Sequence, residues 1–253
     1  MKLNLTGKVA LVTGGGKGIG KSISKQLANE GTSLIIIGRD QKRIVDLVDQ
    51  LNSKIGLKRH KAIPCDLMEP EDLKKLLKFF KKNYFPDIIV HNVGGSLGIS
   101  NPLAPKKDWE KVWNLNLGNS IEINNAVIPN MIKEKWGRIV HISTISTITF
   151  DGNPAYVCSK SALNAYVKNL SRVYAKYNII ISAVAPGAIH VENKFYAKML
   201  KKDPSFLNEY YDNHLAIGRL GNADEISPFV TLLCSDLASF ASGCIIPVDG
   251  GTW

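Results

Sequence analysis

Short runs rich in valine and isoleucine recur along the chain, and each is followed by a longer stretch with helical spacing of its apolar residues. The first six runs are apolar at nearly every position, which is typical of parallel strands that are covered on both faces. Their alternation with helices predicts right-handed crossovers and a doubly wound parallel α/β sheet. The seven predicted strands cover residues 8–13, 33–38, 59–64, 87–92, 137–143, 179–185 and 243–248.

A chain of 253 residues is long enough for one α/β domain with a core on both sides of its sheet. Neither a linker, a repeat nor a low-complexity segment divides the sequence, so we expect a single domain over residues 1–253. The predicted helices cover residues 19–30, 41–54, 70–83, 109–135 and 154–176.

The segment 187–219 interrupts the alternation, because it has no strand pattern and is rich in aromatic residues. A loop of this length in a compact domain is usually a lid or a binding segment. We therefore predict a substrate lid over about residues 187–219, while apolar helices there would serve equally well as a subunit contact. The aromatic residues are Phe195, Tyr196, Phe206, Tyr210 and Tyr211.

Composition excludes several classes of protein. Hydrophobic residues make up 45% of the chain and charged residues 21%, so a disordered or collagen-like chain is excluded. No apolar run approaches the roughly 20 residues that cross a bilayer, and no apolar segment precedes the first predicted strand, so neither a membrane span nor a secretory signal is expected. The widely spaced cysteines favour reduced thiols in a cytoplasmic protein. They are Cys65, Cys158, Cys234 and Cys244, and Cys158 is predicted to be a core thiol.

The formal net charge of +10 comes from lysines that are spread through every segment and interleaved with acidic residues. This pattern favours a solvated surface over a nucleic-acid-binding face, and no helix-turn-helix or zinc signature is present. No cluster of histidine, cysteine and aspartate has the spacing of metal ligands. We therefore expect a small-molecule substrate, with neither nucleic acid, membrane nor metal as a partner.

A glycine-rich stretch follows the first predicted strand directly and leads into a helix. Glycines let the backbone approach a pyrophosphate, and the helix N-terminus offers unpaired N–H groups and the positive end of its dipole. The spacing is Thr-Gly-x-x-x-Gly-Ile-Gly rather than G-x-G-x-x-G, but its position between strand and helix predicts a dinucleotide site. The residues assigned to this phosphate-binding loop are Gly14, Gly15, Gly16, Lys17, Gly18, Ile19 and Gly20.

The end of the second predicted strand indicates which dinucleotide binds. NAD sites place an acidic residue there to hold the ribose diol, but Gly38 stands at that position and Arg39 follows it. Lys17 supplies a second cation, and two cations without a carboxylate favour the 2′-phosphate of NADPH over NADH. Asp40 is predicted to point away from the ribose and to begin the next helix.

Tyr156 and Lys160 are four residues apart at the start of a predicted helix, so their side chains share one face. A lysine ammonium stabilises a phenolate, and we expect it to lower the pKa of Tyr156 so that the phenol exchanges a proton near neutral pH. The preceding strand ends in Ser143 and Thr144, whose hydroxyls are suited to bind a carbonyl oxygen.

Together these motifs resemble the short-chain dehydrogenase/reductase family over essentially the whole chain, in its compact single-domain type that includes 3-oxoacyl-acyl-carrier-protein reductases. The resemblance implies a Rossmann-type fold, an NAD(P) cofactor, oxidoreductase activity and a homotetramer. The matching motifs are the glycine loop 13–20, Asp66-Leu67, Asn92-Val93-Gly94, Asn116, Tyr156-x-x-x-Lys160, Pro186-Gly187-x-Ile189 and Val248-Asp249-Gly250-Gly251.

The resemblance also implies roles for single residues. Asp66 and Leu67 would flank the adenine, while Asn92 and Gly94 would line the floor of the cofactor site, which Pro186, Gly187 and Ile189 would complete. Tyr156 would be the proton donor and Lys160 would hold the nicotinamide ribose. Asn116 would complete a tetrad by anchoring a water that links Lys160 to solvent.

Three positions depart from the family pattern. Counting forward from Asn116 places the family's catalytic serine on Thr144, whereas counting back from Tyr156 places it on Ser143; we favour Thr144, because a strand register is harder to shift than a loop. Val191 replaces a frequent threonine that binds the nicotinamide end. His91 replaces the first asparagine of the Asn-Asn-Ala-Gly motif and is predicted to serve packing.

The sequence thus predicts an NADPH-dependent carbonyl reductase, with a 3-oxoacyl thioester among its candidate substrates. Dehydrogenases of sugars, steroids or other secondary alcohols share the same motifs, so the substrate stays open. A non-catalytic, dinucleotide-binding regulator is the alternative from another class, and the joint presence of Tyr156, Lys160 and Asn116 argues against it. Apolar positions on the predicted helix 154–176 and the Trp253 terminus predict a homodimer or homotetramer of two-fold symmetry.

Overall fold

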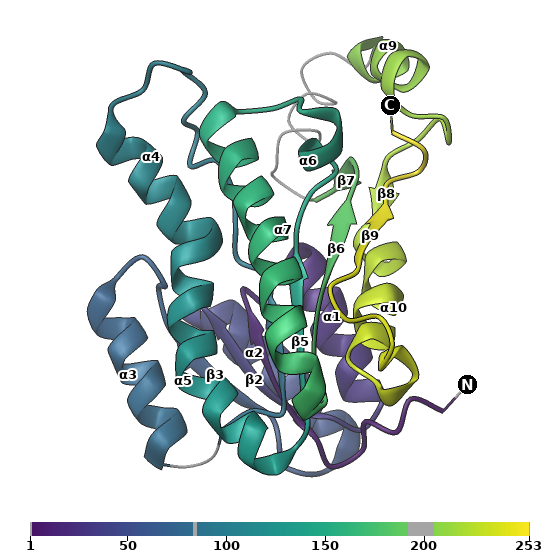
Figure 1. The fold of residues 1–253 in the computed structure, drawn as a ribbon. Coiled ribbons are helices and arrows are strands. Elements are labelled where there is room, and N and C mark those ends of the chain that lie inside the picture. The colour runs from purple at the N-terminus through teal and green to yellow at the C-terminus, as the bar shows by residue number, and fades with distance from the viewer. Residues whose placement is uncertain (1, 83–84, 192–204, 253) are drawn as a thin grey trace.

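The computed structural model describes residues 2–82, 85–191 and 205–252. Its main sheet has seven parallel strands in the order β3-β2-β1-β4-β5-β6-β9 (Figure 1), which confirms the predicted doubly wound sheet. The strands are β1 (Val9–Thr13), β2 (Ser33–Gly38), β3 (Lys61–Pro64), β4 (Ile88–His91), β5 (Gly137–Ile142), β6 (Ile179–Pro186) and β9 (Ile245–Val248).

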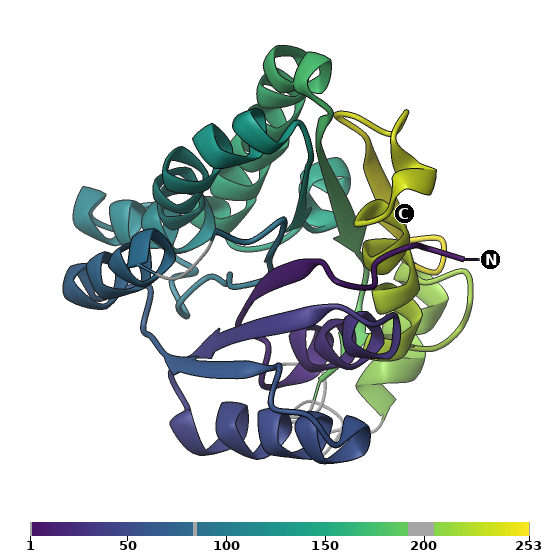
Figure 2. The same cartoon turned by 90° about the horizontal axis from the view of Figure 1, so that it is seen from below.

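Helices cover both faces of this sheet (Figure 2), because neighbouring strand residues point to opposite faces and both sets are apolar. Val12 packs with one hydrophobic cluster and Leu11 with the other. One cluster includes residues of α1 (Gly18–Asn29), α2 (Gln41–Ile55) and α10 (Ala223–Leu233). The other includes residues of α3 (Pro70–Lys82), α5 (Asn119–Glu134) and α7 (Pro154–Tyr174). Within the described ranges, no helix is both long and apolar enough to cross a membrane.

The order of the strands fixes where a ligand can bind. The chain runs from β1 outward to β3 and then returns to β4 on the other side of β1. Segments that follow β1 and β4 therefore diverge at the carboxyl edge of the sheet, and such a topological switch point is where open α/β folds bind ligands. The glycine loop follows β1, and Asn92 follows β4.

The prediction of one continuous helix over residues 109–135 is wrong, because this stretch is divided into three elements. It begins earlier, as α4 (Lys106–Trp113), passes through a π-helix (Asn114–Gly118) and continues as α5. The interruption has a local cause, because the side-chain amide of Asn116 donates to the carbonyl oxygen of Val112 at 2.8 Å, four residues earlier. A side chain that takes this acceptor competes with the backbone ladder of an α-helix.

The prediction that residues 187–219 have no strand is also wrong. A second, two-stranded sheet pairs β7 (Ile189–His190) with β8 (Gly221–Asn222), and two-residue strands are too short for a periodicity to reveal. The segment also contains α9 (Ser205–His214). Its central part, with Phe195, Tyr196 and the nearby lysines, lies outside the described residues.

Besides α9, two further α-helices were not predicted from the periodicity. One is the single turn α6 (Ser146–Thr149), and the other is α10. A capping box marks the start of α10, since Asn222 and Glu225 satisfy each other's backbone N–H groups. This Asn-x-x-Glu pattern is a start signal that the sequence carries, although Pro228 inside the helix obscures it.

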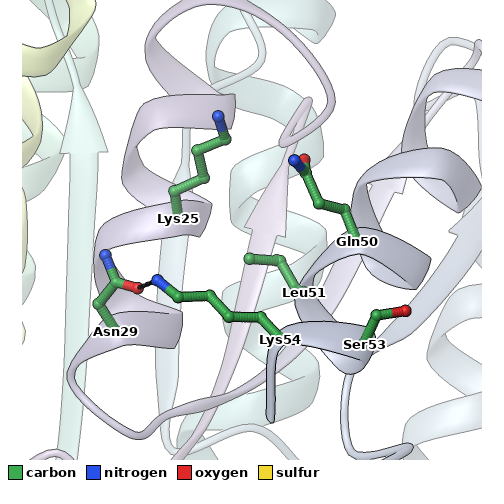
Figure 3. Close-up of a pocket in the computed structure, with 6 residues that line it drawn as sticks. All are labelled: Lys25, Asn29, Gln50, Leu51, Ser53 and Lys54. Atoms are coloured by element: carbon green, nitrogen blue, oxygen red, sulfur yellow. Dashed lines mark hydrogen bonds between the residues drawn. The ribbon is translucent and has the colours of Figure 1, made fainter. Parts of the chain in front are cut away.

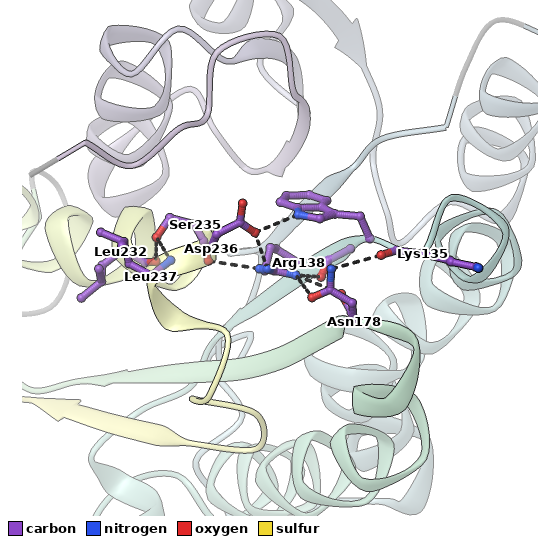
Figure 4. Close-up of polar contacts among 9 residues, drawn as sticks. Lys135, Arg138, Asn178, Leu232, Ser235, Asp236 and Leu237 are labelled. Atoms are coloured by element: carbon purple, nitrogen blue, oxygen red, sulfur yellow. Dashed lines mark hydrogen bonds and ion pairs between the residues drawn. The ribbon is translucent and has the colours of Figure 1, made fainter.

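A buried arginine ties β5 to the C-terminal part of the chain (Figure 4). The guanidinium of Arg138 is fully buried, donates to the carbonyl oxygens of Asn178 at 3.0 Å and Ser235 at 3.1 Å, and pairs with the Asp236 carboxylate at 2.7 Å. Its charge is therefore compensated by acceptors that follow it in the chain by 40 residues, at Asn178, and by almost 100 residues, at Ser235 and Asp236, as a buried charge requires.

Candidate active site

The glycine loop is held against the end of β4. The Thr13 hydroxyl accepts hydrogen bonds from the backbone N–H groups of Asn92 at 2.9 Å and Val93 at 3.1 Å. In return, the side-chain amide of Asn92 donates to the carbonyl oxygens of Thr13 at 3.0 Å and Gly14 at 3.3 Å. Asn92, predicted to line the cofactor floor, thus fixes the shape of the predicted phosphate-binding loop.

The loop has no room for side chains at its glycines. Gly14 has φ +63°, and a Cβ on Gly15 would lie 2.8 Å from Ser24 Oγ and 2.9 Å from Ile36 Cγ2. Lys17 occupies the N-cap of α1 and makes no side-chain hydrogen bond to the first turn. The first N–H groups of α1 and the positive end of its dipole therefore face the loop, an arrangement that fits a pyrophosphate. Gly16, Gly18, Ile19 and Gly20 complete this cradle.

The predicted adenosine end lies along the same edge of the sheet. Gly38 ends β2, and the largely exposed Arg39 places Nη1 3.9 Å from the Asp66 carboxylate. Asp40 caps α2 by accepting the Arg43 N–H at 3.1 Å, so the expectation that Asp40 begins the helix is confirmed. Leu67 is buried beside Asp66.

Tyr156 and Lys160 project from one face of α7, four residues apart, toward the end of β5. The Thr144 side chain lies close enough to the Tyr156 hydroxyl to lower the pKa of the phenol. The buried Lys160 ammonium donates to the carbonyl oxygen of Ile142 at 2.7 Å. The structure therefore brings together the three side chains that the sequence assigned to a proton donor, its cation and a carbonyl-binding hydroxyl.

Asn116 reaches the same place from the π-helix. Its side chain accepts from the Gly95 N–H at 3.0 Å and donates to the carbonyl oxygens of Gly95 and Val112, both at 2.8 Å. A Cβ on Gly94 would lie 2.8 Å from Asn116 Oδ1 and 3.0 Å from Lys160 Nζ. Gly94 is thus the position where Asn116 and Lys160 converge, and only a glycine leaves space there.

Burial shifts the pKa values of both titratable groups. It lowers the pKa of Lys160 to about 7, because the ammonium is removed from water. It raises the pKa of Tyr156, and the nearby Thr144 side chain only partly opposes this effect. The expected lowering of the Tyr156 pKa by Lys160 is therefore wrong for this structure, since desolvation of the phenolate dominates. The phenol stays protonated at neutral pH.

The two candidate hydroxyls differ in what they contact. Ser143 is buried, and its hydroxyl donates to Oδ1 of Asn164 at 2.7 Å. Thr144 is half-buried, and its hydroxyl meets Tyr156. Sequence reasoning missed Asn164, although its place four residues after Lys160 puts it on the catalytic face of α7.

The far end of the predicted cofactor site is closed by backbone packing. Pro186 ends β6, and its carbonyl oxygen accepts the Ile145 N–H at 3.0 Å. A Cβ on Gly187 would lie 2.6 Å from the Cα of Asp249. Ile189 is half-buried in β7, and a Cβ on Gly18 would lie 3.1 Å from Cγ1 of Val191.

His91 lies in the core, which agrees with its predicted packing role. Its ring is buried, stacks on His141 with centroids 4.5 Å apart and places Nε2 2.8 Å from Asn124 Oδ1. The prediction of a core thiol at Cys158 is wrong, because this side chain is exposed. Its place two residues after Tyr156 on the helix does turn it away from Tyr156, but the described part of the chain leaves the thiol exposed.

A cleft of about 500 Å³ opens between α1 and α2, and it is distinct from this site (Figure 3). Its lining includes Asn29 and Lys54, which are joined by a hydrogen bond of 2.9 Å. Asn29 is the last residue of α1, whereas the glycine loop precedes the first. At about 1.5 Å per residue, the two ends of the helix are roughly 16 Å apart, so this cleft is too distant to hold the phosphates.

Comparisons with known proteins agree with this geometry. The model of the short chain dehydrogenase family matches residues 8–198. The 3-oxoacyl-[acyl-carrier-protein] reductase of Aquifex aeolicus (strain VF5) is 32% identical over 255 residues, covering 99% of each chain. The 2-dehydro-3-deoxy-D-gluconate 5-dehydrogenase of Pseudoalteromonas atlantica is 34% identical and covers 99% of this chain and 97% of its own.

Among solved structures, L-sorbose reductase from Gluconobacter frateurii, complexed with NADPH and L-sorbose, has a TM-score of 0.91 at 26% identity. The match covers 99% of this chain and 98% of that one. The family model, the relatives and the arrangement of Tyr156 and Lys160 lead to the same conclusion: the chain belongs to the short-chain dehydrogenase family of oxidoreductases.

Proposed function

We propose that this protein is an NADPH-dependent carbonyl reductase, with a 3-oxoacyl thioester as the leading substrate class. The observation that carries the proposal is the meeting of Tyr156, Thr144 and Lys160 at the same edge of the sheet as the glycine loop. The similarity to 3-oxoacyl-[acyl-carrier-protein] reductases over 99% of the chain supports this substrate class.

The proposed cofactor site follows from the cradle described above. When bound, NADPH would supply a hydride to the carbonyl carbon. Lys17 and Arg39 would meet its 2′-phosphate, and the absence of an acid at Gly38 would avoid repulsion. The other residues proposed to hold the cofactor are Gly14, Gly15, Gly16, Gly18, Ile19, Gly20, Asp66, Leu67, Asn92, Gly94, Tyr156, Lys160, Pro186, Gly187 and Ile189.

The chain's own groups would handle the carbonyl oxygen. The Thr144 hydroxyl would donate a hydrogen bond to it, which places that oxygen beside the Tyr156 hydroxyl. Tyr156, protonated at neutral pH, would give its proton to the oxygen and complete the alcohol. The Lys160 ammonium would stabilise the phenolate left behind. Asn116 would fix the Gly95 backbone that borders Lys160, and the linked water stays a prediction.

A sugar alcohol or keto-sugar is the second candidate substrate class. The relatives that favour it are the 2-dehydro-3-deoxy-D-gluconate 5-dehydrogenase and the L-sorbose reductase. Both classes require the same proton donor and differ in the body of the substrate. We propose that the segment 187–219 closes over that body. A small apolar cluster in and beside the described part of this segment borders this end of the sheet. In it, Leu215 and Leu220 are buried, and Tyr210 and Tyr211 pack against them.

We further propose that the protein works as a homotetramer or homodimer in the cytoplasm. Exposed apolar side chains near the C-terminal region, Phe229, Leu237 and Phe240, support an interface there. Four free cysteines fit a reducing compartment. Light scattering at micromolar concentration should give a mass of two or four chains, and a monomer of 27.8 kDa would contradict the assembly.

The deciding experiment is a reductase screen read by the loss of nicotinamide absorbance. NADPH and NADH are each offered with 3-oxoacyl thioesters, keto-sugars, oxo-steroids and small ketones. We expect turnover with NADPH, fastest with a 3-oxoacyl thioester. Faster turnover of a keto-sugar would select the second candidate, and NADPH binding without turnover of any class would support the non-catalytic regulator instead.

A further inference from the structure

Asn164 connects the catalytic helix to the turn that carries Thr144. It lies on α7 four residues after Lys160 and eight after Tyr156, so the three side chains form one row along the helix. Lys160 holds the Ile142 carbonyl oxygen, and Asn164 contacts the next residue, Ser143. Only Asn164 in this row has no role in the proposed chemistry.

The hydrogen bonds of Asn164 form a continuous chain to Thr144. Oδ1 of Asn164 accepts from the Ser143 hydroxyl at 2.7 Å, and Nδ2 donates to the Thr147 hydroxyl at 2.9 Å. Thr147 uses its own proton to donate to the carbonyl oxygen of Thr144 at 2.8 Å. Asn164 thus holds the residues before and after Thr144 at once.

The directions of these bonds leave little freedom. A hydroxyl has one proton, and that of Thr147 is committed to Thr144, so Thr147 must accept from Asn164. The amide of Asn164 therefore turns its oxygen to Ser143, whose hydroxyl must donate. A side chain that only donates or only accepts cannot satisfy both partners in this way.

The backbone N–H groups on either side of Thr144 are hydrogen-bonded to β6. The conformational freedom that remains lies in the rest of the turn over residues 143–147. The Ser143 N–H donates to the Val184 carbonyl oxygen at 2.7 Å and the Ile145 N–H to that of Pro186 at 3.0 Å. Among the described residues, the hydroxyl of Thr144 makes two long hydrogen bonds to Ser146: it accepts from the Ser146 N–H and donates to the Ser146 hydroxyl, each at 3.3 Å.

We propose that Asn164 is a positioning residue that clamps the turn over residues 143–147, so that the Thr144 hydroxyl meets the Tyr156 hydroxyl. The proposal rests on the proposed reductase function, because Thr144 and Tyr156 are its carbonyl-binding and proton-donating groups. The role of Ser143 follows from it: this serine supports the clamp and does not touch the substrate.

Activity provides the first test. Asn164→Leu should lower kcat by about tenfold to a hundredfold, the cost of a small misplacement of a catalytic group, while the Kd for NADPH changes less than twofold. Adding Ser143→Ala should cost nothing further, since Ser143 acts only through Asn164. Asn169→Leu is the matched control, because the exposed Asn169 on the same helix bonds only to the carbonyl oxygen of Ala165.

The second test does not depend on activity. Nuclear magnetic resonance of protein labelled with ζ-¹³C-tyrosine, assigned with Tyr156→Phe, follows the ionisation of Tyr156. Losing the contact with Thr144 should raise its pKa, so Asn164→Leu should raise it as Thr144→Val does, and the double variant no further. If Asn164→Leu fails to fold, Thr147→Val replaces it, since it breaks the chain at Thr147 with a smaller change and adds no charge.

The outcomes separate the clamp from the function. Unchanged kcat and an unchanged Tyr156 pKa in Asn164→Leu would overturn the clamp. A Ser143→Ala variant that loses more activity than Thr144→Val would also overturn it, because Ser143 would then be the carbonyl-binding hydroxyl. Wild-type protein without reductase activity, but with the expected change in the Tyr156 pKa, would overturn the proposed function and leave the clamp supported.

Discussion

Burial favours the neutral form of the two titratable groups of the catalytic face, Tyr156 and Lys160. The phenol of Tyr156 has a raised pKa and keeps its proton, while the ammonium of Lys160 has a pKa of about 7 and is mostly charged only below that pH. Reduction of a carbonyl to an alcohol needs the proton of Tyr156 and the positive charge of Lys160.

Removing the proton donor is the most direct prediction for a single residue. Tyr156→Phe should bind NADPH with unchanged affinity but lose kcat by roughly 10²–10⁴-fold, the usual contribution of general acid catalysis. Steady-state kinetics beside a fluorescence titration of NADPH would measure both quantities. Tyr177→Phe is the control, since this partly exposed tyrosine lies in the 3-10 turn that follows the far end of α7. Near-normal activity of Tyr156→Phe would rule out the mechanism.

The pKa of Lys160 predicts how kcat/KM for NADPH depends on pH. The kcat/KM for NADPH reports groups of the free enzyme, and the ammonium of Lys160 is charged below its pKa of about 7 and neutral above it. This parameter should therefore fall above pH 7, by about tenfold per pH unit at most. Lys160→Arg should remove the pH step because a guanidinium stays charged, while Lys168→Arg on the same helix should keep it. A flat wild-type profile would exclude this assignment.

At the scale of elements, the ends of β2 and the glycine loop should decide between the two nicotinamide cofactors. Lys17→Ala combined with Arg39→Ala should raise the KM for NADPH by about tenfold to a hundredfold, the value of one charged hydrogen bond or more. The KM for NADH should change less than twofold, because NADH lacks the 2′-phosphate. Lys21→Ala, an exposed lysine on α1, is the control. A wild-type preference for NADH would contradict the interpretation of Gly38.

The elements that the sequence predicted correctly are those whose formation depends on the local pattern of residues. Seven strands were located within two residues at each end because both faces of a parallel sheet demand apolar runs. The π-helix at Asn114–Gly118 was not predictable, since it depends on where the Asn116 amide finds an acceptor. The strands β7 and β8 exist only as a tertiary pair.

The predictions for the candidate site were likewise correct where they rested on local spacing and wrong where the outcome depends on tertiary packing. Spacing four residues apart predicted that Tyr156 and Lys160 share a face, and a strand register favoured Thr144 beside them. The direction of the Tyr156 pKa was wrong, because desolvation depends on packing that no spacing reveals. Asn164 was missed because its partners, Ser143 and Thr147, come from a turn whose path only the fold defines.

At the scale of the whole molecule, buried histidines predict a loss of stability in acid. Burial lowers the pKa of His60 and of His91 to about 4. Between pH 6.5 and 4 the unfolded chain therefore binds protons that the folded chain does not, and the free energy of unfolding must fall as the pH falls. Each such histidine contributes at most about 1.4 kcal/mol per pH unit in this window.

Urea unfolding at pH 7, 6 and 5 would measure this slope. His91→Asn should make the curve shallower, because its side chain keeps the place near Asn124 without a titrating ring. His214→Asn is a suitable control, since His214 lies outside both main clusters of the core. Equal stability of the wild type at pH 7 and pH 5 would refute the prediction.

The buried Arg138 has a consequence for synthesis on the ribosome. Its guanidinium enters the sheet with β5, but Ser235 and Asp236, which neutralise it, are translated almost 100 residues later. A nascent chain that closed its sheet earlier would bury an unpaired charge, at a cost on the order of 3–5 kcal/mol. Chains stalled before residue 235 has left the exit tunnel should remain sensitive to protease, and chains stalled after residue 252 has left the tunnel should resist it. The last strand of the sheet, β9, lies beyond that point in the chain, so we expect the sheet to be completed only late in synthesis.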